Sequence, residues 1–186
     1  MIYTETEIKG VWMIDPEVFR DTRGYFMESY KKPEFERCIG DVCFIQENES
    51  CSMQGVLRGL HYQLEPYAQS KLVRVIAGEV FDVAVDIRKG SPTFGRYIAV
   101  VLSSENKRQL FIPKGFAHGF YVMSETVVFT YKVDNPYMLA YERGICFEDP
   151  AIGVDWRLLP GCAVNISEKD RMAPLMNEAE NNFVYI

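Results

Sequence analysis

Long hydrophobic runs, paired cysteines and an excess of positive charge are all missing from this chain of 186 residues. The longest apolar stretches, such as IAVVL at 98–102, are too short to cross a bilayer, and the first ten residues lack a signal-peptide core. The five cysteines form no C-x-x-C pair, so we expect free thiols and a cytoplasmic protein rather than a disulfide framework. A net charge of −6 argues against a nucleic-acid polymer as partner, but a local basic pocket could still bind a small anion.

Helical periodicity is also scarce, whereas apolar and polar residues alternate over much of the chain. In 79–87, EVFDVAVDI, large apolar residues alternate with Asp82 and Asp86, which is the pattern of a half-buried strand. One short helix is expected at 32–40, between Pro33 and Gly40. Further strands are expected, with turn signals between them, at 71–78, 97–103, 109–113, 119–124 and 126–133. The sequence therefore predicts one all-β domain over 1–186, a sandwich or barrel, with 167–186 as a C-terminal tail packing on it.

Histidine is the scarcest titratable residue, with only two in the chain. His61 lies in GVLRGLHYQ (55–63) and His118 in PKGFAHGFYV (113–122), both strand-like segments that also carry a glycine close to the histidine. Glycine permits the close approach of a backbone or a ligand, and we interpret Gly59 as giving a substrate room beside His61. Either histidine alone is compatible with a satisfied core residue, but the two together favour a shared site inside the barrel.

Other polar and aromatic side chains fall in expected strands, where burial would be costly unless they are paired or functional. Tyr131 is in phase with Phe129 and Val133, so it is expected to point inward with them. Each such residue alone is compatible with a solvated strand face. The full set that favours a polar pocket is Arg23, Phe26, Glu28, Gln46, Asn48, Lys71, Arg74 and Tyr131.

A series of motifs, in order and spacing, resembles the dTDP-4-dehydrorhamnose 3,5-epimerase family: RDTRGYFMESY, QENES, GVLRGLHYQ, KLVRVIAGEVFDVAVDIRKGSPTFG, IPKGFAHGF, TYKV, ERGICFEDPAIGVDW and SEKD. The resemblance extends from about Gly10 to Pro174. It implies a cupin-like jelly-roll β-barrel with a few short helices, usually a homodimer. It also implies a dTDP-linked 4-keto sugar as substrate, with no metal and no organic cofactor.

The resemblance also assigns roles by position. His61 resembles the catalytic base, Asp170 its acidic partner, Tyr131 the proton donor on the opposite face of the sugar, and Lys71 the cation near the keto oxygen. The residues that resemble the family's substrate-binding set are Arg23, Phe26, Glu28, Gln46, Asn48, Arg58, His118, Tyr137, Glu142 and Lys169.

These residue types suit proton transfer beside a ketone. A histidine titrates near neutral pH, and a carboxylate on its second nitrogen fixes the tautomer. The enolate oxygen needs a cation or donor, a role that suits Lys71 together with His118. Tyr131 would return the proton on the other face, and Arg58 could bind phosphate oxygens. The expected reaction inverts C3 and C5 of dTDP-4-dehydro-6-deoxy-D-glucose to give dTDP-4-dehydro-L-rhamnose.

Alternatives to this reaction stay open. A related enzyme could invert only C3 or only C5 of another nucleotide 4-keto sugar. A metal-dependent cupin ranks below it, because Gly55 to His61 keeps a cupin spacing but Gln63 stands where a second ligand histidine is expected. A non-catalytic sugar-nucleotide binder ranks lower still, since it would not need a His–Asp pair and a tyrosine opposite it.

Overall fold

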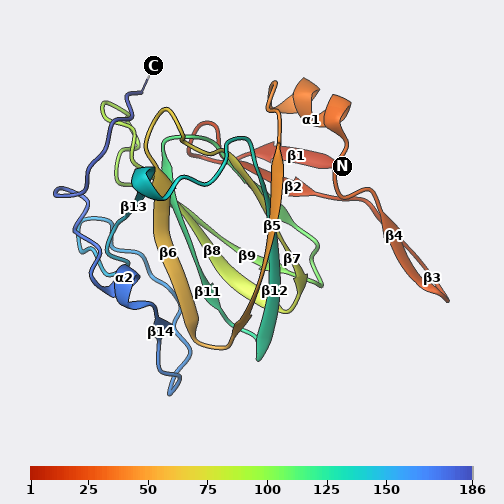
Figure 1. Cartoon of the computed structure of the whole chain (residues 1–186). Helices are drawn as coiled ribbons and strands as arrows, with labels where there is room; N and C mark the ends of the chain where they lie inside the picture. The colour runs from red at the N-terminus through yellow and green to blue at the C-terminus, as the bar shows by residue number, and fades with distance from the viewer. Residues whose placement is uncertain (186) are drawn as a thin grey trace.

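Two six-stranded sheets face each other across a hydrophobic interior in the computed structural model, which describes residues 1–185 (Figure 1). The first sheet has the order β1 (Ile2–Glu5), β2 (Trp12–Asp15), β10 (Gln109–Ile112), β7 (Lys71–Ala77), β12 (Thr126–Val133) and β5 (Gln46–Met53). The second has the order β13 (Glu142–Gly144), β6 (Val56–Gln63), β11 (Phe116–Val122), β8 (Glu79–Asp86) and β9 (Tyr97–Ser103), with β14 (Asn165–Ile166) parallel to the start of β6. This jelly-roll arrangement confirms the predicted all-β fold class.

Three short helical pieces and one hairpin complete the structure. They are α1 (Lys32–Cys38), the 3₁₀ turn η1 (Leu139–Tyr141), α2 (Glu168–Arg171) and the hairpin of β3 (Val18–Asp21) with β4 (Gly24–Met27). Helix α1 begins with a proline in its first turn, as expected, and buries Phe35 against the first sheet. No helix among residues 1–185 has the length and apolar character needed to span a membrane.

Both faces of the second sheet are buried. On its inner face, Val80, Ala84 and Phe120 pack against Phe129 of the first sheet. Its outer face is covered by the C-terminal segment, whose buried side chains include Trp156. The predicted half-buried character of 79–87 is therefore wrong, because the face that carries the aspartates is the barrel interior and not the solvent side. The alternation itself is present, with each face covered by a different part of the chain.

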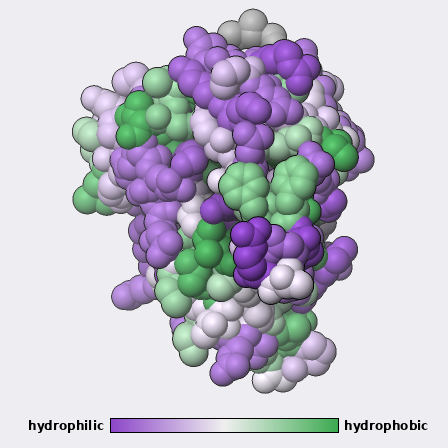
Figure 2. Space-filling view, turned by 90° about the vertical axis from the view of Figure 1, so that its right-hand side faces the viewer, coloured by the Kyte–Doolittle hydropathy of each residue, from purple (hydrophilic) through white to green (hydrophobic). Residues whose placement is uncertain are grey.

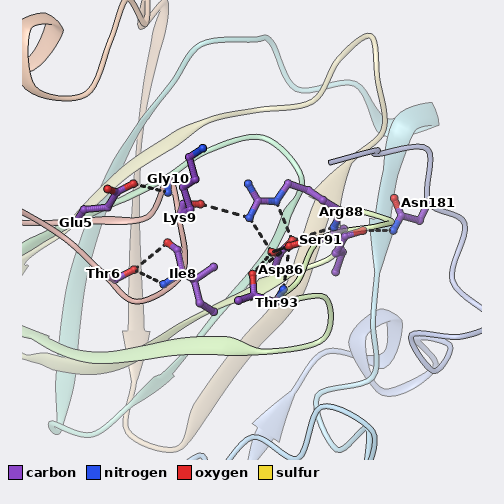
Figure 3. Close-up of polar contacts among 11 residues, drawn as sticks. Glu5, Thr6, Ile8, Lys9, Gly10, Asp86, Arg88, Ser91, Thr93 and Asn181 are labelled. Carbon is purple, nitrogen blue, oxygen red and sulfur yellow. Dashed lines mark hydrogen bonds and ion pairs between the residues drawn. The ribbon is translucent and has the colours of Figure 1, made fainter. Parts of the chain in front are cut away.

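A cluster of hydrogen-bonded polar side chains around Asp86 stabilises the loop between β8 and β9 (Figure 3). The Asp86 carboxylate is fully buried and accepts hydrogen bonds from Arg88 at 2.8 and 2.7 Å, from Ser91 at 2.6 Å and from Thr93 at 2.6 Å. Arg88 also donates to the carbonyl oxygen of Lys9 at 3.3 Å. Burial opposes ionisation, but the donors outweigh it and lower the pKa of Asp86. Every acceptor in the cluster has a partner, which indicates a structural role.

The C-terminal segment is tied to the barrel by its own contacts. The side-chain amide of Asn181 donates to the carbonyl oxygen of Ile87, and the Tyr62 hydroxyl donates to the carbonyl oxygen of Glu180 at 2.6 Å. The ring of Phe183 packs at 6.2 Å from that of Tyr62. These contacts hold the segment that carries α2 against the outer face of β6 (Figure 1).

Candidate active site

A cavity of about 310 Å³ lies between the two sheets. Its side chains come from both walls, with Lys71 and Tyr131 on the first sheet and His61 and His118 on the second. The two histidines are cross-strand neighbours in the β6–β11 ladder, so the fold brings them to one cavity. The remaining lining residues are Glu49, Ser50, Arg58, Gly119, Phe120, Phe129, Tyr137, Glu142 and Lys169.

His61 contacts Asp170, which lies 109 residues further along the chain. The Nε2 atom of His61 lies 2.6 Å from Oδ1 of Asp170, and Asp170 is 4% exposed. The parallel pairing of β14 with β6 sets this contact, because it places the start of α2 beside His61, and Ser167 caps that helix through the Asp170 amide. Burial opposes ionisation of Asp170, but the contact with His61 and the hydrogen bonds with Gly59 and Ser167 together outweigh it and lower the pKa of this carboxyl. The arrangement leaves Nδ1 as the histidine nitrogen free of Asp170.

Lys71 and Tyr131 form the opposite wall, with the Lys71 ammonium 6.0 Å from the centroid of the Tyr131 ring. Burial lowers the pKa of Lys71 to about 8, although the negative charges of Asp82 and Glu142 oppose the shift. Burial raises the pKa of Tyr131 above its ordinary value. At neutral pH Lys71 is therefore mainly an ammonium and Tyr131 a neutral phenol, that is, a charge stabiliser and a proton donor.

An acid–base cluster lies at the mouth of the cavity. Glu142 pairs with Lys169 at 2.8 Å and accepts a hydrogen bond from the Tyr137 hydroxyl at 2.8 Å. Burial opposes ionisation of Glu142, but these two partners outweigh it and lower its pKa. Arg58 also lines the cavity and donates to Ser52 at 3.2 Å. Arg58 and Lys169 give the mouth two cationic groups in a protein of net negative charge.

Gln46 and Asn48 lie on edge strand β5, beside Tyr131 rather than in the cavity lining. The Gln46 amide donates to the Asn48 side chain at 2.7 Å, and Asn48 is the cross-strand neighbour of Tyr131. Both are partly buried, whereas the alternate residues of this strand, Glu47 and Glu49, are exposed. The two predicted residues therefore share the face that continues the cavity towards the edge of the first sheet.

Three predicted binding residues, Arg23, Phe26 and Glu28, do not lie at the cavity. They belong to the β3–β4 hairpin and the segment after it, and the hairpin projects from the barrel (Figure 1). Arg23 pairs with Asp21 in the same hairpin, and the Phe26 side chain is 67% exposed. Figure 2 views the molecule from this side and shows hydrophobic side chains surrounded by hydrophilic surface. Within one chain these three residues are not brought together with the histidines.

The glycines beside the histidines make room for the backbone and not for a substrate, so the predicted role of Gly59 is wrong. A Cβ atom on Gly59 would lie 2.6 Å from Cα of Gly119 and 2.6 Å from the carbonyl oxygen of His118. A Cβ on Gly119 would lie 2.7 Å from the carbonyl oxygen of Arg58. The two glycines therefore let β6 and β11 approach each other closely at the point where both histidines lie.

Asp82 was missed as a site residue because its place in the alternation suggested a solvated face. It is fully buried, and both of its carboxylate oxygens lie close to Nε2 of His118, at 2.9 and 3.1 Å. One signal was available in the sequence: Asp82 lies in a strand with long apolar residues on either side, where an unpaired carboxylate would be costly.

Gln63, which replaces the second ligand histidine of the cupin motif, is engaged elsewhere. Its side-chain amide donates to the carbonyl oxygens of Tyr67 at 2.7 Å and Pro136 at 3.1 Å, and its oxygen accepts from the amide of Met138 at 2.6 Å. The side chain therefore holds the loop before η1 against β6. No group of three or more histidine, cysteine, aspartate or glutamate residues within 1–185 is placed to hold a metal ion.

The cavity of this jelly-roll barrel has a histidine–carboxylate pair on one wall and a tyrosine and a lysine on the other. This arrangement defines a class of acid–base enzyme. Such a site can remove a proton from carbon and return one from the opposite side. Comparisons with known proteins identify the family within this class.

The family model described as dTDP-4-dehydrorhamnose 3,5-epimerase matches residues 5–178. The dTDP-4-dehydrorhamnose 3,5-epimerase of Shigella flexneri is 59% identical over 153 residues, which cover 82% of this chain and 84% of that protein. A solved dTDP-6-deoxy-D-glucose-3,5-epimerase of Legionella pneumophila, in complex with dTDP-4-keto-L-rhamnose, is 49% identical with a TM-score of 0.91, covering 95% of this chain and 93% of that one. A 3'-monoepimerase from Streptomyces bikiniensis, in complex with dTDP-quinovose, is 30% identical with a TM-score of 0.87, covering 93% and 87%. The chain belongs to the dTDP-4-dehydrorhamnose 3,5-epimerase family.

Proposed function

We propose that this protein inverts C3 and C5 of dTDP-4-dehydro-6-deoxy-D-glucose and so forms dTDP-4-dehydro-L-rhamnose. The observation that carries the proposal is the placement of the His61–Asp170 pair and of Tyr131 on opposite walls of one cavity. The names of the most similar relatives and the sugar nucleotide bound to the Legionella protein support the same reaction.

In the proposed mechanism, His61 removes the proton next to the ketone through Nδ1, since Asp170 engages Nε2. Asp170 orients the ring and stabilises the imidazolium that forms. The electron pair moves onto the ketone oxygen, where the Lys71 ammonium stabilises the enolate. Tyr131 then delivers its proton to the opposite face of the same carbon. Each inversion leaves one extra proton on His61 and one too few on Tyr131, so exchange with water restores both groups before the next inversion.

The substrate's diphosphate is assigned to Arg58 and Lys169 at the cavity mouth. Gln46, Asn48 and Tyr137 are assigned to the nucleoside, Tyr137 through its ring. Glu142 and His118 are assigned to the sugar.

We also propose that the protein acts as a homodimer in the cytoplasm. Arg23, Phe26 and Glu28 can serve as binding residues only if a second copy brings its projecting hairpin to the cavity. The exposed rings of Phe19 and Phe26, 6.5 Å apart, support a role of the hairpin in association. The five free cysteines are consistent with a reducing compartment.

Mixing two inactive variants tests the shared site. Chains with His61→Asn and chains with Arg23→Ala together should recover activity, because a mixed dimer contains one site with both native residues. Failure to recover activity in mixed dimers, shown to form by mass spectrometry, would overturn the shared-site assignment.

The catalytic roles are tested by NMR of the dTDP-linked 4-keto sugar in deuterated water. Tyr131→Phe should still allow deuterium to enter next to the ketone, because His61 can return a solvent-derived deuteron to the original face, while net inversion is slowed or lost. His61→Asn should lose exchange and inversion together, with a rate loss beyond about 10²-fold. An unchanged ratio of inversion to exchange in Tyr131→Phe would remove that residue from the mechanism.

A second candidate function is inversion at C3 alone. The similarity to the 3'-monoepimerase of Streptomyces bikiniensis favours it, since the same fold supports that outcome. The two candidate functions predict different deuterium labelling of the product when the wild-type protein acts in deuterated water. Deuterium at both C3 and C5 of the product supports the double epimerase, and deuterium at C3 alone supports the second candidate.

A further inference from the structure

The carboxylate of Asp82 lies behind the cavity rather than in it. His118 and Lys71 line the cavity, whereas Asp82 does not, and its side chain is 0% exposed. Asp82 shares the inward face of β8 with Val80 and Ala84, both of which belong to the apolar interior. A carboxylate at this depth requires partners, and its position makes it a support for residues that touch the substrate.

The partner of Asp82 is one specific nitrogen of His118. Nε2 lies 2.9 and 3.1 Å from the two oxygens of Asp82, and the His118 side chain is 8% exposed. The ring makes no other hydrogen bond within residues 1–185, and no fully buried side-chain nitrogen or oxygen there lacks a partner. Nδ1 is therefore the nitrogen that opens to the cavity.

The charges around the pair favour a neutral ring. Burial lowers the pKa of His118, and the positive charge of Lys71 acts in the same direction, while Asp82 opposes them. The negative charge of Asp82 also acts on the ammonium of Lys71, which lies on the opposite wall. The negative charge of Asp82 is thus balanced by the ammonium of Lys71. A second cation, at His118, would give these three side chains a net positive charge.

We propose that Asp82 is a positioning residue that holds His118 as the neutral tautomer with its proton on Nε2, so that Nδ1 accepts a hydrogen bond from a hydroxyl of the sugar. The proposal rests on the proposed function for the identity of the sugar, but not for the tautomer. It revises the role expected for His118, because a bare Nδ1 cannot donate to the enolate oxygen. Lys71 is then the cavity residue that donates to the enolate, and His118 fixes the orientation of the sugar ring.

The tautomer is measured directly by two-bond ¹H–¹⁵N correlation NMR with ¹⁵N-labelled histidine. The chain has only two histidines, so the signals that vanish in His61→Asn belong to His61 and those that remain belong to His118. We expect a protonated Nε2 and a bare Nδ1 in the wild type at pH 7 without ligand. Asp82→Asn should raise the share of the Nδ1–H form, because the asparagine amide can donate to Nε2 as well as accept from it, whereas a carboxylate only accepts. A protonated Nδ1 in the wild type at pH 7 overturns the proposal. Turnover plays no part in this measurement, so a failed epimerase assay leaves its result intact.

Asp86→Asn provides the matched control, since Asp86 is a second fully buried aspartate of β8 that contacts Arg88 rather than a histidine. This variant should lose stability and keep the His118 tautomer. A change of tautomer in Asp86→Asn equal to that in Asp82→Asn would show a general structural effect and overturn the specific role.

Ligand titrations test the hydroxyl contact. The Nδ1 signal of the wild type should shift on addition of dTDP-4-keto-L-rhamnose and stay in place with dTDP, which lacks the sugar. Asp82→Asn should lose about tenfold in kcat/KM, the equivalent of one hydrogen bond, mainly through KM, with unchanged affinity for dTDP. An equal shift of Nδ1 with dTDP alone would place the contact outside the sugar and contradict the proposal.

Discussion

The charge state of Lys71 should set the alkaline limit of activity. Burial lowers the pKa of its ammonium to about 8, well within the range in which the enzyme can be assayed. With that pKa, about nine in ten molecules carry the ammonium at pH 7, and about one in ten at pH 9. Since the neutral amine cannot offset the enolate charge, kcat/KM should fall about eightfold between pH 8.5 and pH 9.5.

Substitutions of the lysine separate its charge from its position. Lys71→Met removes the cation and should lower kcat by about 10²–10³-fold at pH 7, the usual cost of one group that stabilises an oxyanion. Lys71→Arg keeps a charge that does not titrate below about pH 12, so its profile should be flat where the wild type falls, even if its rate is lower.

The assay is the initial rate of product formation, followed by NMR of the dTDP-linked 4-keto sugar between pH 6 and pH 10. Titration of Tyr131 should not change the rate between pH 6 and pH 10, because burial raises its pKa above the ordinary value of about 10. A wild-type profile that is flat from pH 7 to 9.5 would refute the reasoning. So would a bend near pH 8 that persists in Lys71→Arg, since another group would then be titrating.

Further predictions concern stability, ligand binding and metal. Asp86→Asn should lower the free energy of unfolding by about 3 kcal/mol and the melting temperature by about 6–12 °C. Because the folded pKa of this carboxyl is lowered, calorimetry should show the difference above about pH 4 and its loss as the pH falls further. Gly59→Ala should reduce both stability and activity, because the added Cβ would lie 2.6 Å from atoms of β11. In Gly90→Ala the added Cβ meets no neighbouring atom, so this variant should lower the free energy of unfolding by only about 1 kcal/mol. Equal losses of stability in the two variants would contradict the packing argument. Arg58→Ala should weaken dTDP binding in isothermal titration, and unchanged affinity would move Arg58 away from the diphosphate. Activity should survive a chelator, because Gln63 binds backbone groups, and loss of activity with release of one tightly bound metal per chain would contradict this.

Alternation in the sequence predicted strands well, because a side-chain period of two is a local property. It could not predict what covers each face of a strand. The aspartates of β8 face the barrel interior because the C-terminal segment, far along the chain, covers the other side. The role of Gly59 was misjudged for the same reason, since its neighbour in space is Gly119.

The candidate site depended on resemblance for its long-range contacts. Nothing in the spacing of His61 and Asp170 indicates that they meet, and the parallel pairing of the two-residue strand β14 that brings them together has no signal of its own. The resemblance predicted Arg23 and Phe26 as binding residues, but within one chain they do not lie at the cavity, and a resemblance in sequence gives no information on that distance. For Asp82 the sequence predicted no role. Its burial and its contact with His118 in the structure identify it as a candidate site residue.

The position of Asp170 after the strands of the barrel has a consequence for synthesis. Ten of the twelve strands of the two sheets lie before residue 134, so the walls of the barrel, with both histidines, Lys71 and Tyr131, leave the ribosome first. The carboxylate that orients His61 arrives only with α2, after β14 has paired with β6. An incomplete product that stops before Ser167 contains every residue that lines the cavity except Lys169, but it lacks the carboxylate that contacts His61. Ribosome-bound chains of increasing length should therefore gain protease resistance before they gain the ability to exchange a substrate proton.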